Sequence, residues 1–221
     1  MKEAALIVIE GIDGSGTTTV VERAAAHFRA LGKRVSSTRE PSGGPVGALI
    51  RQVLSHRLVV PAEPAPRSPG WATMALLFAA DRLDHLEAEV LPQLRAGVTV
   101  ISDRYDLSSL AYQSATAPSA PSTSEDTVTW IRALNRQARR PDLTLVLDVS
   151  PEVAAERRRT RGQSHELYEQ AELQARLARI YARAETLVPG DRLVHIDAER
   201  PIDAVLAAVI SAIEALENQQ V

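Results

Sequence analysis

The sequence predicts an α/β fold in which helices cover both faces of a doubly wound, five-stranded parallel sheet. Short apolar runs rich in β-branched residues alternate with longer segments whose apolar residues recur at helical spacing. A glycine-rich turn follows the first apolar run directly and leads into the first helical segment. Because no internal repeat divides the chain, we expect one domain spanning residues 1–221.

The first strand is expected at residues 6–9, and the glycine-rich turn begins at Gly11. Gly11 and Gly16 have the G-x-x-x-x-G spacing of a Walker A loop, whose backbone N–H groups hold a phosphate at the start of the next helix. The turn alone is equally consistent with a connection that binds nothing. Its position between an apolar strand and a helical segment favours a phosphate site.

The Walker A motif usually ends in Lys followed by Ser or Thr, whereas this loop ends in Thr17-Thr18. Thr18 retains the hydroxyl that such loops place on Mg²⁺. Thr17 stands where a lysine would contact the β- and γ-phosphates of a nucleotide. The loop therefore lacks its usual cation.

The remaining elements follow from periodicity, turn residues and apolar runs. A helix over 17–31 ends at Gly32, and a weak strand over 34–38 leads into the loop 39–45. Four prolines make residues 55–70 an exposed connection. Pro92 is expected to bend or shorten a long helix over 71–95. We expect further helices over 46–54, 107–113, 124–138, 153–161, 167–187 and 202–216, and strands over 98–101, 143–148 and 193–196.

Two charged clusters are candidates for a ligand site. Asp103 and Arg104 follow the third strand, and ligands of open parallel sheets collect beyond the carboxyl ends of strands. A local ion pair is the alternative. The segment 157–161 contains four arginines, and it is either a solvated helix end or an anion-binding surface.

Composition narrows the class of protein. A formal net charge of -3 argues against a nucleic-acid partner. The absence of cysteine excludes disulfides, thiolate zinc sites and cysteine nucleophiles. No apolar stretch approaches the roughly 20 residues of a membrane span, and no signal peptide is recognisable. We therefore expect a cytoplasmic enzyme that makes no membrane contact.

Five segments together resemble the thymidylate kinases. They are the glycine loop, the Arg39-Glu40-Pro41 loop, LLFAADR (76–82), ISDRYDLSSLAYQ (101–113) and PDLTLVLDVSPEV (141–153). The resemblance implies a P-loop kinase fold with an arginine-rich lid at about 157–169. It also implies transfer of the γ-phosphoryl group of ATP to dTMP, giving dTDP, with Mg²⁺ as cofactor and a homodimer as the assembly.

The resemblance assigns roles to individual residues. Phe78 would stack on the thymine ring, Arg82 would contact a base carbonyl, and Tyr112 would exclude a ribose hydroxyl. Ser109 and Gln113 would complete the contacts to the base, and Arg104 and Arg39 would hold the acceptor phosphate. ATP would bind Gly11, Ile12, Asp13, Gly14, Ser15, Gly16, Thr17 and Thr18. Metal contacts would come from Thr18, Asp103 and Glu40, and catalytic groups would be Asp13, Arg104, Arg157, Arg159 and Arg161.

The missing lysine determines the alternatives. The only lysines, Lys2 and Lys33, are expected on the order of 20 Å from the phosphate site, so a replacement cation must be an arginine. Relatives carry such an arginine either in the P-loop next to the aspartate or in the lid, and with Gly14 after Asp13 this chain resembles the second kind. Its lid differs in carrying Gln163-Ser164-His165-Glu166 where relatives usually have an Asp-Arg pair. The alternatives to an active dTMP kinase are a catalytically impaired dTMP-binding protein and a nucleotide kinase with altered donor or acceptor preference.

Overall fold

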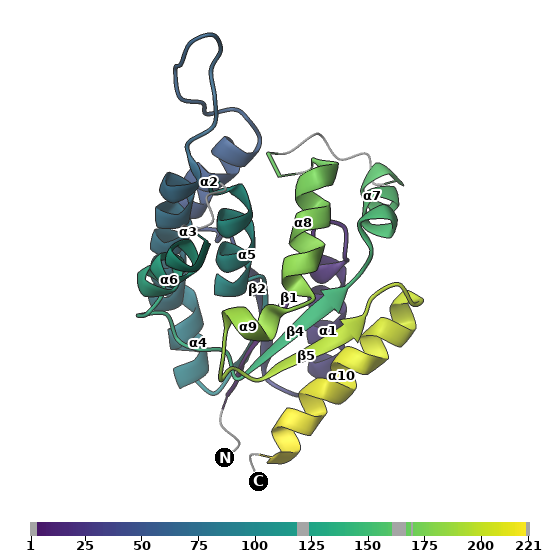
Figure 1. Cartoon of the computed structure of the whole chain (residues 1–221). Coiled ribbons are helices and arrows are strands. Elements are labelled where there is room, and N and C mark those ends of the chain that lie inside the picture. Colours follow the sequence, from purple (N-terminus) through teal and green to yellow (C-terminus); the bar gives the residue numbers. More distant parts are fainter. Residues whose placement is uncertain (1–3, 119–123, 161–166, 169, 220–221) are drawn as a thin grey trace.

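The computed structural model describes residues 4–118, 124–160, 167–168 and 170–219. Its strands form one parallel sheet in the order β2-β3-β1-β4-β5, which confirms the predicted fold class (Figure 1). The strands are β1 (Leu6–Gly11), β2 (Val35–Arg39), β3 (Thr99–Asp103), β4 (Leu143–Asp148) and β5 (Leu193–Asp197).

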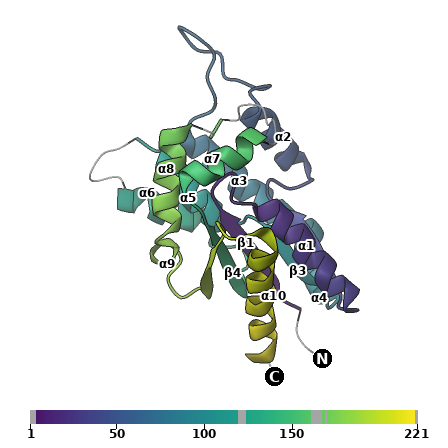
Figure 2. The same cartoon turned by 90° about the vertical axis from the view of Figure 1, so that its right-hand side faces the viewer.

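Helices cover both faces of the sheet, with α1 and α10 on one face and α5 and α8 on the other (Figure 2). Helix α4 packs against β3, and its Leu91 and Leu94 contact the cluster that contains Leu6 and Val8 of β1. The central strand β1 shows why both faces need cover, because all six of its residues are buried. Alternate residues of β1 point to opposite faces: Ile7 and Ile9 pack in a hydrophobic cluster that includes Val20 and Phe28 of α1. Leu6 and Val8 pack in a second cluster that includes Leu86. The helices are α1 (Thr17–Ala30), α2 (Pro45–Leu54), α3 (Trp71–His85), α4 (Leu91–Arg95), α5 (Asp106–Thr116), α6 (Ser124–Leu134), α7 (Pro151–Thr160), α8 (Ala171–Tyr181), α9 (Ala184–Leu187) and α10 (Ile202–Gln219).

The register of the sheet brings the carboxyl ends of the strands to one edge. Asp103 pairs with Ile9 of β1 and with Arg39 of β2, and Gly11 pairs with Leu147 of β4. The glycine loop, the Arg39–Pro45 loop and the Asp103-Arg104 cluster therefore meet at this edge. This is the position at which open parallel sheets bind ligands.

Three predicted helices differ in the structure. The segment 71–95 is interrupted by a π-helical turn, η1 (Leu86–Val90), and Pro92 lies in the first turn of α4, where its missing N–H is tolerated. The single helix expected over 167–187 is wrong, because α8 ends at Tyr181 and α9 follows. The helix starting at Ser124 ends at Leu134 rather than at residue 138. Tertiary packing, which periodicity does not report, sets these boundaries.

The segment 55–70 projects from the body of the molecule beyond α2 (Figure 1). Val60 and Arg67 pair across it through backbone hydrogen bonds of 2.7 and 3.0 Å. The predicted exposed connection is thus confirmed, with one antiparallel bridge near its base. Within the described part of the chain, no helix is both long enough and apolar enough to cross a membrane.

Candidate active site

The glycine loop runs from the end of β1 into α1 in the conformation of a phosphate cradle. Gly14 and Gly16 have φ angles of +94° and +98°, which residues with a side chain rarely adopt. A Cβ at Gly14 would lie 2.4 Å from the carbonyl oxygen of Ala154 in α7. Glycine at this position therefore lets α7 pack directly over the loop.

Thr18 and Asp103 form a pair of oxygen ligands beside the loop. The Thr18 Oγ1 donates a 2.5 Å hydrogen bond to Asp103 Oδ2, while Asp103 Oδ1 is buried without a hydrogen-bond partner in the described residues. A hydroxyl and a carboxylate fit Mg²⁺, which prefers oxygen ligands and usually takes the others from water and phosphates. In the described ranges, no group of three His, Cys, Asp or Glu residues that could hold a metal occurs.

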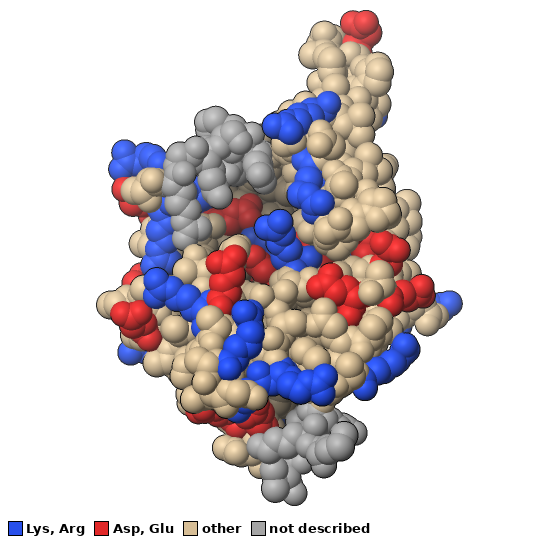
Figure 3. All heavy atoms as spheres, turned by 180° about the vertical axis from the view of Figure 1, so that it is seen from behind, with Lys and Arg blue, Asp and Glu red and all other residues tan. Residues whose placement is uncertain are grey.

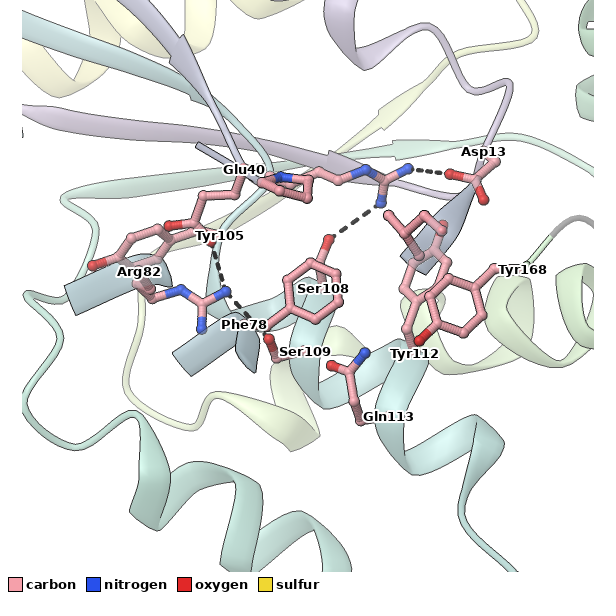
Figure 4. Close-up of a pocket in the computed structure, with 13 residues that line it drawn as sticks. Asp13, Glu40, Phe78, Arg82, Tyr105, Ser108, Ser109, Tyr112, Gln113 and Tyr168 are labelled. Carbon is pink, nitrogen blue, oxygen red and sulfur yellow. Dashed lines mark hydrogen bonds and ion pairs between the residues drawn. The ribbon is translucent and has the colours of Figure 1, made fainter. Parts of the chain in front are cut away.

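A cavity of about 140 Å³ lies next to this pair, between the glycine loop and helices α3 and α5 (Figure 4). Its wall combines aromatic rings with polar and charged side chains. Tyr112 and Tyr168 meet edge to face on one side, with ring centroids 5.3 Å apart. The cavity is lined by Asp13, Glu40, Pro41, Leu54, Phe78, Arg82, Arg104, Tyr105, Ser108, Ser109, Tyr112, Gln113 and Tyr168.

Arg104 is the cation nearest the loop side of this cavity. Its backbone has a φ of +73°, an uncommon conformation for a residue other than glycine. The guanidinium donates to Gly11 O at 2.8 Å, Ser108 Oγ at 3.2 Å and Asp13 Oδ1 at 2.6 Å (Figure 4). Burial disfavours its charged form, but Tyr112, Asp13 and other neighbours raise the pKa of Arg104 well above its ordinary value. Arg104 therefore carries its charge at any physiological pH.

A buried acidic residue, Glu10, shares the Ser108 hydroxyl with Arg104 as a hydrogen-bond partner. Glu10 is fully buried at the end of β1 and accepts hydrogen bonds from the N–H groups of Tyr105 and Ser108, at 2.8 and 3.1 Å. The hydroxyls of Ser108 and Tyr181 also bond to it, at 2.5 and 3.0 Å. Burial raises the pKa of Glu10 to about 7, although Arg104 and these hydrogen bonds lower it.

Arg82 and Glu40 lie at the opposite end of the cavity. Arg82 is buried, and its guanidinium contacts Glu40 Oε2 at 2.6 Å, Ser109 Oγ at 3.2 Å and Asn135 Oδ1 at 2.5 Å. Its Nε has no hydrogen-bond partner in the described residues, and neither does Gln113 Oε1. Buried polar atoms of this kind are rarely left unpaired, so they indicate groups that a ligand would satisfy.

Helix α7 directs two of its arginines at the glycine loop. Arg158 donates to Asp13 O, and Arg157 donates to Ser15 O at 3.5 Å and to Ala198 O at 2.8 Å. They lie one turn after Ala154, the residue packed on Gly14, and so share its helix face. Arg159 points away and pairs with Glu156. Figure 3 shows Lys and Arg side chains gathered in and beside the hollow beneath the projecting segment 55–70.

A second cavity, of about 340 Å³, lies on the outer side of the glycine loop. It extends from the start of α1 to the loop after β5, and Arg157 of α7 forms part of its wall. Its lining residues are Ser15, Gly16, Thr19, Val20, Arg23, Arg157, Thr160, Ala198, Arg200, Ile202 and Val205. The phosphate cradle therefore has one cavity on each side.

Comparisons with known proteins agree with this architecture. The family model described as thymidylate kinase matches residues 9–209. The chain belongs to the thymidylate kinase family. A "Probable thymidylate kinase" of Pyrobaculum calidifontis is 40% identical over 208 residues, covering 94% of this chain and 95% of that protein. A "Thymidylate kinase" of Bifidobacterium longum is 38% identical over 220 residues, covering 95% and 97% of the two chains.

For this member of the thymidylate kinase family, the structure brings most of the predicted site residues together. Arg39 is exposed at the end of β2 and does not line the cavity, and the Glu40 carboxylate bonds to Arg82 rather than lying against Thr18. Arg161 and residues 163–166 lie outside the described residues. The predicted residues that line the cavity are Asp13, Glu40, Phe78, Arg82, Arg104, Ser109, Tyr112 and Gln113.

Sequence reasoning did not single out several residues of the site. Arg158 lies four residues after Ala154 and so on the same helix face. This spacing identifies it as a site residue only once the contact between Ala154 and the glycine loop is known. The others carried no local signal, because their partners are far apart in the chain. They are Glu10, Ser108, Tyr168 and Gln174.

The raised pKa of Glu10 makes the stability of this thymidylate kinase family member depend on pH. The folded chain holds the Glu10 proton up to about pH 7, whereas the unfolded chain releases it near 4.5. The folded state is therefore favoured below the unfolded pKa, and this contribution is lost as pH rises through the folded pKa. Glu10→Gln removes the titration and keeps two acceptor contacts. Between pH 5 and 8, we expect wild type to lose about 2 kcal/mol of unfolding free energy relative to Glu10→Gln.

Urea unfolding of both proteins at several pH values measures this difference. The comparison cancels the titration of the other carboxylates, which both proteins share. A difference between the two proteins that does not change from pH 5 to pH 8 would contradict the prediction.

Proposed function

We propose that this protein transfers the γ-phosphoryl group of ATP to dTMP, giving dTDP, with Mg²⁺. The observation that supports this most directly is the pair of unpaired polar atoms in the first cavity, a donor at Arg82 Nε and an acceptor at Gln113 Oε1. Thymine presents a carbonyl acceptor beside an N–H donor, which matches this pair.

The rest of the first cavity suits the remainder of dTMP. The half-buried ring of Phe78 offers a face for the base, and Tyr112 narrows the cavity between the base end and Arg104. A planar guanidinium such as that of Arg104 bonds a phosphate through two parallel hydrogen bonds. The acceptor phosphate would then lie beside Asp13, toward the glycine loop.

The second cavity and the glycine loop suit the donor. The loop N–H groups would hold the phosphates of ATP, and the cavity beside Ser15 and Arg200 would hold its nucleoside part. Thr18 and Asp103 would hold Mg²⁺, which reduces the charge on the donor phosphates when bound. Phosphoryl transfer requires chiefly this alignment of acceptor and donor together with charge stabilisation.

Arginine would supply the cation that Thr17 does not. Lys33 cannot, because its Nζ pairs with Glu217 of α10 at 2.5 Å, away from the loop. Arg157 and Arg158 reach the loop backbone from α7, and each guanidinium retains N–H donors beyond the contacts that it makes. We propose that this pair replaces the Walker A lysine.

Product analysis tests the proposed function. Purified protein is incubated with ATP and Mg²⁺ and with dTMP, dUMP, CMP or no acceptor, and the nucleotides are separated. We expect dTDP with dTMP and no product with CMP. Thr17→Lys is run in parallel, and we expect wild type to be at least as active as this variant. A silent wild type beside an active Thr17→Lys would identify a dTMP-binding protein whose donor site is impaired.

We further propose that the protein acts as a homodimer through α2 and α3. Leu49 of α2 and Leu76 of α3 are large apolar side chains that are 40% and 51% exposed. A second copy covering them would remove that apolar area from water. Light scattering of the preparation used for the assay measures the assembly, and a monomer of 23.9 kDa at assay concentration would exclude the proposal.

A further inference from the structure

Helix α8 carries two polar residues on the face that it buries. Gln174, Leu177 and Tyr181 are its buried residues, and Gln174 and Tyr181 are 0% and 2% exposed. Seven residues correspond to almost two helical turns, so both polar side chains lie on one face of the helix. Buried polar groups are costly unless they are hydrogen-bonded. The partners of these two side chains therefore matter.

Gln174 bonds to two parts of the site at once. Its side-chain nitrogen donates to Asp13 Oδ2 at 3.0 Å and to the backbone carbonyl of Tyr168 at 2.7 Å. The other oxygen of Asp13 accepts from Arg104 at 2.6 Å. Asp13 is thus held between Gln174 and Arg104.

Tyr181 contacts Ser108, another side-chain partner of Arg104. Its hydroxyl lies 3.0 Å from Glu10 Oε2 and 3.0 Å from Ser108 Oγ. Ser108 Oγ in turn accepts a hydrogen bond from Arg104 at 3.2 Å. Asp13 and Ser108, which each bond to the Arg104 guanidinium, are therefore both held from α8.

We propose that α8 positions Arg104 indirectly, with Gln174 and Tyr181 as positioning residues for acceptor binding. Gln174 also links this arrangement to Tyr168, because the backbone carbonyl of Tyr168 accepts a hydrogen bond from the same amide group. The ring of Tyr168 packs edge to face on Tyr112 in the wall of the first cavity. Displacement of Tyr168 would thus disturb the amide that holds Asp13. The inference rests on the proposed function in one respect, that Arg104 binds the acceptor phosphate.

The test measures dTMP affinity by calorimetry without ATP, together with steady-state kinetics. Gln174→Met keeps the side-chain length and removes both hydrogen bonds, one of them to a charged group. We expect its dTMP affinity to fall about tenfold, and its KM for dTMP to rise equally, while its KM for ATP stays within about twofold of wild type. Tyr181→Phe should weaken dTMP binding about threefold, because the hydroxyl acts on Arg104 through Ser108.

Two controls distinguish an effect on the position of Arg104 from a general loss of fold stability in the variants. Leu177→Val shortens the side chain between the two polar residues and should leave both KM values unchanged. In an Asp13→Ala background, Gln174→Met should add less than about twofold to the loss of dTMP affinity, because the residue through which it acts is absent.

The outcomes distinguish this inference from the proposed function. Unchanged dTMP affinity in Gln174→Met, or a lower kcat with both KM values unchanged, would overturn the inference. If Gln174→Met does not fold, the affinity of Tyr181→Phe decides in the same way. A wild type that binds dTMP without turnover would refute phosphoryl transfer alone, and one that binds no dTMP would refute both.

Discussion

Arg104→Lys is expected to lower kcat/KM for dTMP about a hundredfold. The guanidinium of Arg104 spans Gly11, Asp13 and Ser108 and faces the acceptor cavity, whereas an ammonium group is a single point charge that cannot span these partners. Losing a two-point contact to a phosphate accounts for a loss of this size. Steady-state kinetics with dTMP as the varied substrate measure it.

Lysine is the informative substitution at this position. It preserves the positive charge beside Asp13 and requires the same backbone φ of +73°, so a loss of activity is not explained by an unpaired carboxylate. The KM for ATP serves as an internal control, because in the proposed function the donor phosphates are held by the loop amides rather than by Arg104. A kcat/KM for dTMP within threefold of wild type would show that Arg104 does not bind the acceptor phosphate.

The second large effect is expected at α7. Arg157→Ala and Arg158→Ala should each lower kcat about a hundredfold if, as we propose, these side chains supply the positive charge that Thr17 does not. Helix α7 packs on the loop through Ala154 and Gly14, and the two guanidinium groups contact the loop carbonyls of Ser15 and Asp13. Single-turnover measurements at saturating ATP would report the chemical step.

Arg159→Ala is the matched control. It makes the same change one residue further along the same helix, but Arg159 is exposed and pairs only with Glu156 among the described residues. Exposed pairs of this kind contribute little to stability, so we expect kcat to stay within twofold of wild type. Equal losses in all three variants would mean that α7 acts through its overall charge rather than through a directed pair.

The sequence by itself determined the order of the elements and the place of the site. Apolar runs as short as residues 6–9 predict buried strands, and buried parallel strands require helices on both faces. The glycines after β1 and the Asp103-Arg104 pair after β3 mark the carboxyl edge of the sheet, because residues at strand ends need no knowledge of packing to be placed there. Phe78, Arg82, Tyr112 and Gln113 were chosen from motif resemblance, and the structure places all four in the wall of one cavity.

Only the tertiary structure decided which charges face one another. Arg157, Arg158 and Arg159 are equivalent in sequence, and the packing of Ala154 on Gly14 directs the first two at the loop and the third at solvent. Glu10 and Gln174 carry no local signal, because their partners lie about 100 and 160 positions away in the chain. Local pattern encodes which face of an element is buried, whereas the partner of each buried polar group depends on how the elements pack.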